Sequence, residues 1–268
     1  MNNVFDIKRF GNYFLYDLRR AKNNYGLSLL ILGLIPVILY IFFGFFRLIS
    51  GSGMDIGEMP DELKYMGVFI SCTVVIFGAG AKLYGFLTGK KAGSDFLMLP
   101  ASTFEKWLAM SLIVCVVLPL VLGVLLFASD GVMGLLFPNT YGTRLFTADL
   151  GQEWIRQLSE SGVSINIPAY LFLQWCLDIL IFTLGAICFK KAKVAKTLLC
   201  LILFGMMISL LALIFFGHAH LDFDWLESTF GTPEKAVSAI NWTISLVYAV
   251  GIGLLLGGTY YRLRTLKH

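Results

Sequence analysis

Six long apolar segments divide this chain, and their length constrains its fold more strongly than any motif. Each holds about 20 residues, which is the number that a helix needs to cross roughly 30 Å of hydrocarbon. Only 14% of the residues are charged, whereas soluble domains carry about 25%. The sequence therefore predicts an all-α integral membrane protein with six membrane-spanning helices in a single transmembrane domain over residues 1–268. The predicted spans are 27–49, 67–87, 107–127, 167–189, 197–217 and 240–260.

Positive charge lies mostly in the gaps on one side of these spans. If the N-terminus is placed on that side, the side holds 16 of the 21 Lys and Arg residues and a net charge of +12, against −7 on the other side. Lys and Arg in short loops stay in the cytoplasm. We therefore expect both termini to be inside. Anionic lipid of the inner leaflet accounts for the basic side, so no nucleic-acid partner is required.

The segment before the first span has the pattern of an amphipathic helix. Within residues 1–26, apolar side chains recur at steps of three and four, while Arg9, Asp17, Arg19 and Arg20 lie mostly away from that stripe. A basic amphipathic helix beside a membrane lies in the plane of the interface. We predict an interfacial helix here, and the alternative is a simple flanking anchor. The five cysteines all lie within predicted spans, which fits a bacterial cytoplasmic membrane.

The loop over residues 88–107 carries the best-formed local signals. Gly89 is suited to end one helix, Pro100 prevents a helix from continuing through Leu99, and Ser102 with Glu105 forms a capping box that begins the next helix. Between these signals lie Phe96, Leu97, Met98 and Leu99, which we expect to be exposed. Exposed apolar side chains need a cover. The cover is either the membrane interface and the helix bundle, or a cytoplasmic partner that docks on this loop.

Asp178 is the most informative single residue within a predicted span. It lies near the middle of the segment 167–189, and Gln174 lies one turn away on the same face. An ionised carboxylate at the centre of a bilayer costs about 3 kcal/mol or more, so it should face protein or water. A structural, hydrogen-bonded aspartate, a residue on a transport pathway and a proton-coupling group all remain open. Partners considered for it on other spans are Ser71, Thr73, Ser209 and Thr243.

Signals of catalysis are largely absent from the sequence. The segment 85–91 has one residue too few for a phosphate-binding loop, and neither a zinc-protease motif nor a nucleophile elbow occurs. The alternation of His218, His220, Asp222 and Asp224 is more typical of a solvated turn than of a metal site. We therefore predict no catalytic, cofactor-binding or metal-ligating residues, and no enzyme activity. Gly253 and Gly257 form a G-x-x-x-G pattern that favours helix packing, with a homodimer seam as the alternative.

The segment LMLPASTFEKW, placed between the second and third spans, resembles the permease subunits of bacterial ABC exporters of the type-2 class, and is closest to the small permeases of Bacteroidetes-like genomes. The overall plan is similar too: an amphipathic N-terminal helix, six spans and both ends inside. The acidic segment 218–241 departs from the family, which often has an apolar re-entrant hairpin there.

The resemblance implies a function and a set of partners. By this resemblance, the first inside loop of the chain would hold the coupling helix. That helix docks into a cytoplasmic ABC ATPase subunit, which carries the ATP and Mg²⁺. A second permease copy, identical or related, would complete a dimer surrounded by membrane lipid. The docking residues implied are Lys91, Ser94, Asp95, Phe96, Leu97, Met98, Leu99, Pro100, Ser102, Glu105 and Lys106.

Two other classes of function stay open. A secondary transporter or channel would use Asp178 and Gln174 on its pathway, although no inverted repeat is evident. A non-transporting scaffold or sensor subunit would share the docking loop and need no central cavity.

Overall fold

The computed structural model describes residues 5–50, 58–89, 93, 96, 98–142, 144–145, 167–216 and 233–266. All regular structure in these residues is helical. The elements are α1 (Ile7–Gly33), α2 (Ile35–Ile49), α3 (Asp61–Tyr84), the 3-10 helix η1 (Gly85–Thr88), α5 (Thr103–Leu112), the π-helix η2 (Ile113–Val117), α6 (Leu118–Leu136), α7 (Pro138–Tyr141), α9 (Ile167–Cys188), α10 (Lys193–Phe216) and α12 (Pro233–Thr265).

The helices fit a protein that crosses a membrane several times. In the described part of the chain, five helical segments are long and apolar enough to span a bilayer, and there are six if α1 and α2 together count as one bent span. Each of the six predicted spans overlaps one of these segments over most of its length. The prediction of an all-helical, multi-pass membrane architecture is therefore confirmed at this level.

The first span bends by 43° between α1 and α2. Pro36 causes the break, because a proline has no N–H to donate to the carbonyl four residues earlier, which is that of Leu32. Neighbouring helices supply the missing donors. The Ser71 hydroxyl donates to the Leu32 carbonyl at 3.0 Å, and the Ser129 hydroxyl donates to the Gly33 carbonyl at 2.7 Å. A kink within the apolar part of the chain is thus fully hydrogen-bonded, as a membrane interior requires.

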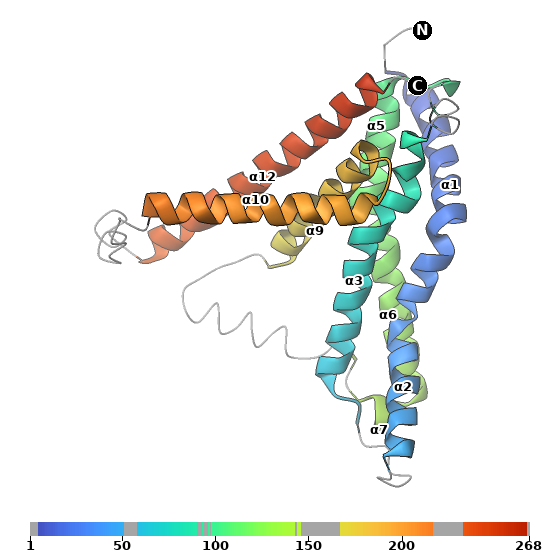
Figure 1. Cartoon of the computed structure of the whole chain (residues 1–268). Coiled ribbons are helices and arrows are strands. Elements are labelled where there is room, and N and C mark those ends of the chain that lie inside the picture. The colour runs from blue at the N-terminus through green and yellow to red at the C-terminus, as the bar shows by residue number, and fades with distance from the viewer. Residues whose placement is uncertain are drawn as a thin grey trace.

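The N-terminal segment is continuous with the first half of this span. Residues 7–33 form one helix that packs along α3, α5 and α6 (Figure 1). Asp17, which we expected on the polar face, is buried together with Tyr13 and Tyr25. That face assignment was wrong, because the Tyr84 hydroxyl of α3 donates to Asp17 Oδ2 at 2.9 Å and stabilises a carboxylate there. The placement of this helix in the membrane interface stays a prediction.

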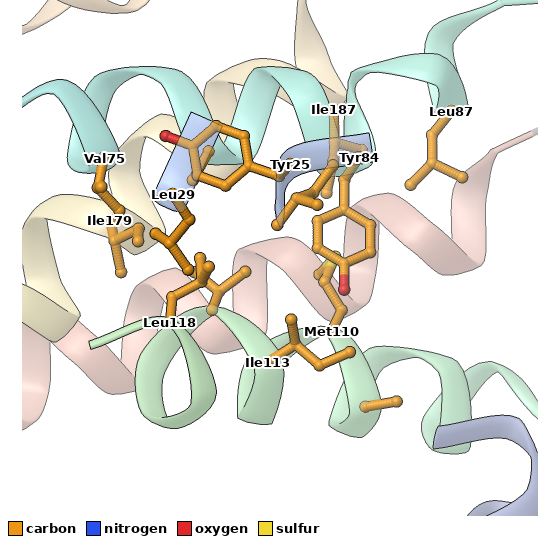
Figure 2. Close-up of a cluster of buried hydrophobic side chains, with 14 of the residues drawn as sticks. Tyr25, Leu29, Val75, Tyr84, Leu87, Met110, Ile113, Leu118, Ile179 and Ile187 are labelled. Carbon is orange, nitrogen blue, oxygen red and sulfur yellow. The ribbon is translucent and has the colours of Figure 1, made fainter. Parts of the chain in front are cut away.

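The best-packed region lies where α1, α3, α5, α6 and α9 meet. Figure 2 shows side chains from these helices converging on a common core. The backbones of α3 and α9 approach closely, since a Cβ atom on Gly80 would lie only 2.8 Å from the Thr183 Cα. Only a glycine allows backbones this close. Labelled members of the core are Tyr25, Leu29, Val75, Tyr84, Leu87, Met110, Ile113, Leu118, Ile179 and Ile187.

The helices α10 and α12 diverge from this core (Figure 1). Only 6% of the apolar stretch of each is buried, against 33–44% for the spans of α3, α5–α6 and α9. In α12, Gly251 and Gly258 face leucines of α9, whereas a Cβ on Gly253 or Gly257 would have nothing within 4 Å. The Gly253–Gly257 pair therefore does not pack on another helix of the described chain, and its use as a homodimer seam stays a prediction.

The third span is longer than expected. It runs from Thr103 to Leu136 as α5, η2 and α6. The π-helical turn lies just before Pro119, which has no N–H for the carbonyl of Cys115, so wider hydrogen bonding there accommodates the proline. Asp130, which we expected in an outer loop, is instead a buried residue of α6. The acidic segment 218–241 lies outside the described residues up to residue 232, and its last residues form the beginning of α12.

Candidate docking surface and intramembrane polar site

Three chain segments that each carry Lys or Arg meet at one end of the structure. They are the first turn of α1, the first turn of α5 and the last turn of α12 (Figure 1), and we call this the basic end. Trp107 of α5 connects to α12, since its Nε1–H donates to the Leu256 carbonyl and to Thr259 Oγ1, both at 3.0 Å. The last turns of α12 are thereby held next to the loop that precedes α5.

Glu105 is the central anchor of the basic end. The predicted capping box is confirmed: Ser102 Oγ accepts from the Glu105 N–H at 3.2 Å, and Glu105 Oε2 accepts from the Ser102 N–H at 2.8 Å. Glu105 also accepts two hydrogen bonds from one edge of the Arg9 guanidinium, with Nη2 to Oε1 at 2.7 Å and Nε to Oε2 at 2.9 Å. The Asp6 N–H donates to Oε1 at 3.0 Å. One fully buried carboxylate thus joins α1 to the start of α5.

Phe96 forms a second anchor and corrects the sequence prediction. We expected it to be exposed, but it is only 5% exposed. Its ring lies edge-on to Phe86 with centroids 6.0 Å apart, and its carbonyl accepts from Lys106 Nζ at 2.8 Å. The Arg20 guanidinium of α1 covers the other ring, 3.4 Å from the Phe86 centroid. Phe96, Glu105 and Lys106 therefore hold the loop in place, and their burial prevents direct contact with a partner.

Among the described residues between 93 and 102, the exposed part is small. Met98 is 81% exposed, Pro100 is exposed and Leu99 is half-buried, and we call these three residues the 98–100 patch. Leu99 and Pro100 also form one wall of a groove of 570 Å³ whose other wall is the first turns of α1. Of the remaining docking residues implied by the resemblance, Ser102 is half-buried as the N-cap of α5, and Lys91, Ser94, Asp95 and Leu97 lie outside the described residues.

The contact between Asp17 and Tyr84 was not foreseen from the sequence. Both residues are buried, and their hydrogen bond joins α1 to α3 a few turns from the loop. A signal was available: Tyr13, Asp17 and Tyr25 are spaced in multiples of four, which places them on one helix face. An aspartate that shares a face with two large aromatic residues is a candidate for burial with a hydroxyl partner.

Gln174 and Asp178 form a hydrogen-bonded pair that extends from the first half of α9 to its middle. Gln174 Nε2 donates to Asp178 Oδ2 at 2.8 Å, which agrees with the shared face expected from their spacing. The Tyr248 hydroxyl of α12 donates to Gln174 Oε1 at 2.5 Å. None of the expected partners bonds to Asp178; Ser71, Thr73 and Thr243 donate instead to backbone carbonyls of their own helices.

Tyr248 is the member of this site that sequence reasoning missed. A tyrosine in an apolar span is common, so the residue itself carries no signal. The missing information is the pairing of α9 with α12, which also brings the Tyr170 hydroxyl to Ser245 Oγ at 3.2 Å. The result is a line of polar side chains along the α9–α12 contact, which ends at the half-buried carboxylate of Asp178.

At the end of the bundle opposite the basic end, buried charged residues connect the terminal turns of the helices. Asp130 Oδ1 accepts from the Tyr141 hydroxyl at 2.7 Å, and Asp130 Oδ2 accepts from the Leu145 N–H at 3.0 Å. Lys64 of α3 pairs with Asp61 at 2.7 Å, and its Nζ lies 4.6 Å from the centre of the Tyr141 ring. Asp130, Tyr141 and Lys64 are all buried. This cluster fixes α3, α6 and α7 to one another.

No protein-family model matches the chain, and no curated protein or solved structure is significantly similar to it. Within the described residues, His, Cys, Asp and Glu side chains form no group of three or more that could hold a metal ion. The residues His218 to Asp224 lie outside that part of the chain. A function for this protein therefore has to be argued from the basic end and from the α9–α12 site.

Proposed function

We propose that this chain is the membrane-spanning permease subunit of a bacterial ATP-driven ABC exporter. In this proposal the basic end faces the cytoplasm, both termini are inside, and a separate ATPase subunit binds ATP and Mg²⁺. A second permease copy, identical or related, completes the assembly in the cytoplasmic membrane. The chain itself breaks no chemical bond, and its contribution is a conformational change that moves a substrate outward.

One observation carries the proposal: the loop before α5 exposes a small apolar patch on a rigid support. Met98 is the most exposed large apolar side chain described in the basic end. The neighbouring Phe96 and Glu105 are buried and hydrogen-bonded to α1 and α5. A loop without a partner has no need for this combination, because an exposed methionine gains nothing from a fixed position in water. A docking element needs both the exposed apolar side chain and the rigid support. The contact area supplies affinity, and the rigidity reduces the entropy that is lost on binding.

The anchors also suggest how movement passes from a partner to the spans. A force on the 98–100 patch reaches α5 directly through Ser102, the first helix through the Arg9–Glu105 pair, and η1 through the contact of Phe96 with Phe86. Packed interiors resist deformation, so these contacts move together as one body. Closure of two ATPase subunits would then tilt α1, α3 and α5 as a group.

Substitution of Met98 tests this role. We expect Met98→Asp to reduce the ATPase subunit recovered with the purified protein from native membranes at least tenfold, because a desolvated carboxylate in an apolar contact is strongly unfavourable. Met98→Leu should retain recovery, since it preserves apolar volume. The measurement is quantitative mass spectrometry of the co-purified proteins.

The control is Met66→Asp, the same substitution at an exposed position near the opposite end of α3. This variant should retain the ATPase. The proposal fails if no protein with a phosphate-binding loop co-purifies with the wild type, or if Met98→Asp and Met66→Asp have equal effects.

The second candidate is a secondary transporter or channel, which the line of polar groups from Tyr170 to Asp178 favours. Such a protein would work without an ATPase. Transport that is abolished by an uncoupler of the proton gradient and unaffected by ATPase inactivation would support it.

A further inference from the structure

Among the described residues, the α9–α12 site has no positive charge to balance its carboxylate. In the described part of the chain, no Lys, Arg or His lies within 4.0 Å of Asp178, and Gln174 Nε2 is the donor to its Oδ2. No described group donates to Oδ1. Asp178 is half-buried and lies near the middle of α9, about 16 Å from either end at 1.5 Å per residue. Carboxylates at this depth are rare and face a ligand path or a partner.

Asp178 lies on the face of α9 that contacts α12 on one side of it and α10 on the other. Gln174, one turn toward the outer end, contacts Tyr248 of α12. Gly185, two turns toward the inner end on the same face, abuts Thr197 of α10. The carboxylate therefore lies on the side of α9 that faces α10 and α12 (Figure 1). Gln174 is exposed and Asp178 is half-buried, so the site is open at the surface of the described helices.

The neighbouring side chains suit a ligand that is both cationic and apolar. Tyr170 and Tyr248 lie with ring centroids 6.4 Å apart, and aromatic rings attract cations through their faces. The Tyr248 hydroxyl donates its hydrogen to Gln174, so its oxygen is oriented to accept a hydrogen bond from a ligand. Asp178 Oδ1 offers a second acceptor, and an ionised carboxyl group shares its negative charge between Oδ1 and Oδ2. An ammonium group, which donates up to three hydrogen bonds, matches these acceptors.

A metal cation fits the site less well. Calcium and similar hard ions take about six to eight oxygen ligands, whereas the side chains here supply the Asp178 carboxylate and the Tyr248 oxygen. The Gln174 oxygen already accepts from Tyr248, and the backbone carbonyls of these turns belong to helices. An organic ammonium needs fewer oxygen ligands and gains from the apolar surface around them.

We propose that Asp178, with Gln174 and Tyr248, binds the ammonium group of an amphipathic organic cation, which is the cargo class of this protein. This inference rests on the proposed export function, which supplies the need for a cargo site within the membrane. Asp178 pairs with the charge, Gln174 fixes the orientation of the carboxylate, and Tyr248 contributes an acceptor and an aromatic face. The apolar remainder of the cargo lies against the exposed faces of α10 and α12.

The test uses the full chain in nanodiscs of zwitterionic lipid, without any ATPase. The probes are three dansyl-labelled undecyl chains that end in a primary ammonium, a hydroxyl or a carboxylate. We expect the ammonium probe to bind the wild type saturably and at least tenfold more tightly than the hydroxyl probe. Asp178→Asn should remove this preference, and Asp178→Glu should retain most of it. Asp6→Asn is the matched control, because it removes a carboxylate at the basic end, and it should bind as the wild type does.

Size-exclusion profiles and thermal midpoints establish that each variant is folded. Equal affinity of the wild type for the ammonium and hydroxyl probes would overturn the inference. So would an ammonium preference that persists in Asp178→Asn. Since no ATPase is present, a negative result here leaves the Met98 experiment unaffected. Conversely, loss of the ATPase partner in that experiment would remove the export function without altering probe binding.

Discussion

Glu105→Ala should destabilise the protein by about 2–4 kcal/mol, the largest loss that we expect from a single substitution at the basic end. Removal of one partner from a buried ion pair costs about 3–5 kcal/mol. The lower range applies here because the Arg9 side chain is 33% exposed and water solvates it in part, whereas Glu105 is fully buried. The substitution also leaves the N–H groups of Asp6 and Ser102 without their acceptor. Thermal unfolding in detergent, with a calibrated denaturant series, measures the change.

A double-mutant cycle separates the ion pair from the capping box. Arg9→Ala should cost less than Glu105→Ala, because it leaves the capping box intact, and the two changes should be non-additive by about 1–3 kcal/mol. Arg19→Ala is the matched control, since Arg19 is exposed on the same helix and should change stability by less than about 0.5 kcal/mol. Additive effects of Arg9→Ala and Glu105→Ala would show that the two side chains do not stabilise the protein as a pair.

Asp130→Ala should produce the second large effect, a loss of about 2–4 kcal/mol at the opposite end of the bundle. The buried carboxylate accepts from the Tyr141 hydroxyl and from the Leu145 N–H, and its removal leaves two buried donors unsatisfied. Each such donor costs about 1–3 kcal/mol. Tyr141→Phe removes only one of the two bonds and preserves the ring beside Lys64, so it should cost about half as much. The thermal midpoint of each purified variant measures these differences.

Glu62→Gln serves as the control for the outer end, because Glu62 is exposed in the first turn of α3. Its effect should stay below about 0.5 kcal/mol. If Asp130→Ala were no more destabilising than Glu62→Gln, the buried cluster would contribute nothing to the connection between α3, α6 and α7.

The spans and the capping box were predictable because their physical causes are local. Membrane thickness sets the length of an apolar segment, and the Ser102–Glu105 spacing satisfies the first turn of one helix. The exposure of the loop residues was only partly predictable. Phe96 and Met98 are both apolar and two residues apart, yet one is buried and the other exposed. The difference depends on Phe86 and Lys106, which contact Phe96, and on Arg20, which covers the Phe86 ring, and these groups come together only once the helices have packed.

Contacts between distant spans explain the other differences between the predictions from the sequence and the structure. The kink before Pro36 could be expected from the sequence, but the hydroxyls of Ser71 and Ser129 that satisfy it come from other spans. Tyr248 likewise joins the Asp178 site only because α12 packs on α9. Asp130 was assigned to an outer loop because the third span was predicted to end at residue 127, whereas α6 continues past it and Tyr141 stabilises its burial. In each case a single polar partner overrides the local pattern.

Photocrosslinking from position 98 in intact native membranes tests the central claim most directly. A photoreactive amino acid replaces Met98, and the same amino acid at Met66 provides the control from the opposite end of α3. The account predicts a light-dependent adduct at position 98 that contains an ATPase subunit with a phosphate-binding loop, and no such adduct at position 66. Adducts at position 98 with lipid alone, or with no nucleotide-binding protein, would contradict the assignment of the 98–100 patch as the docking site of an ATP-driven exporter.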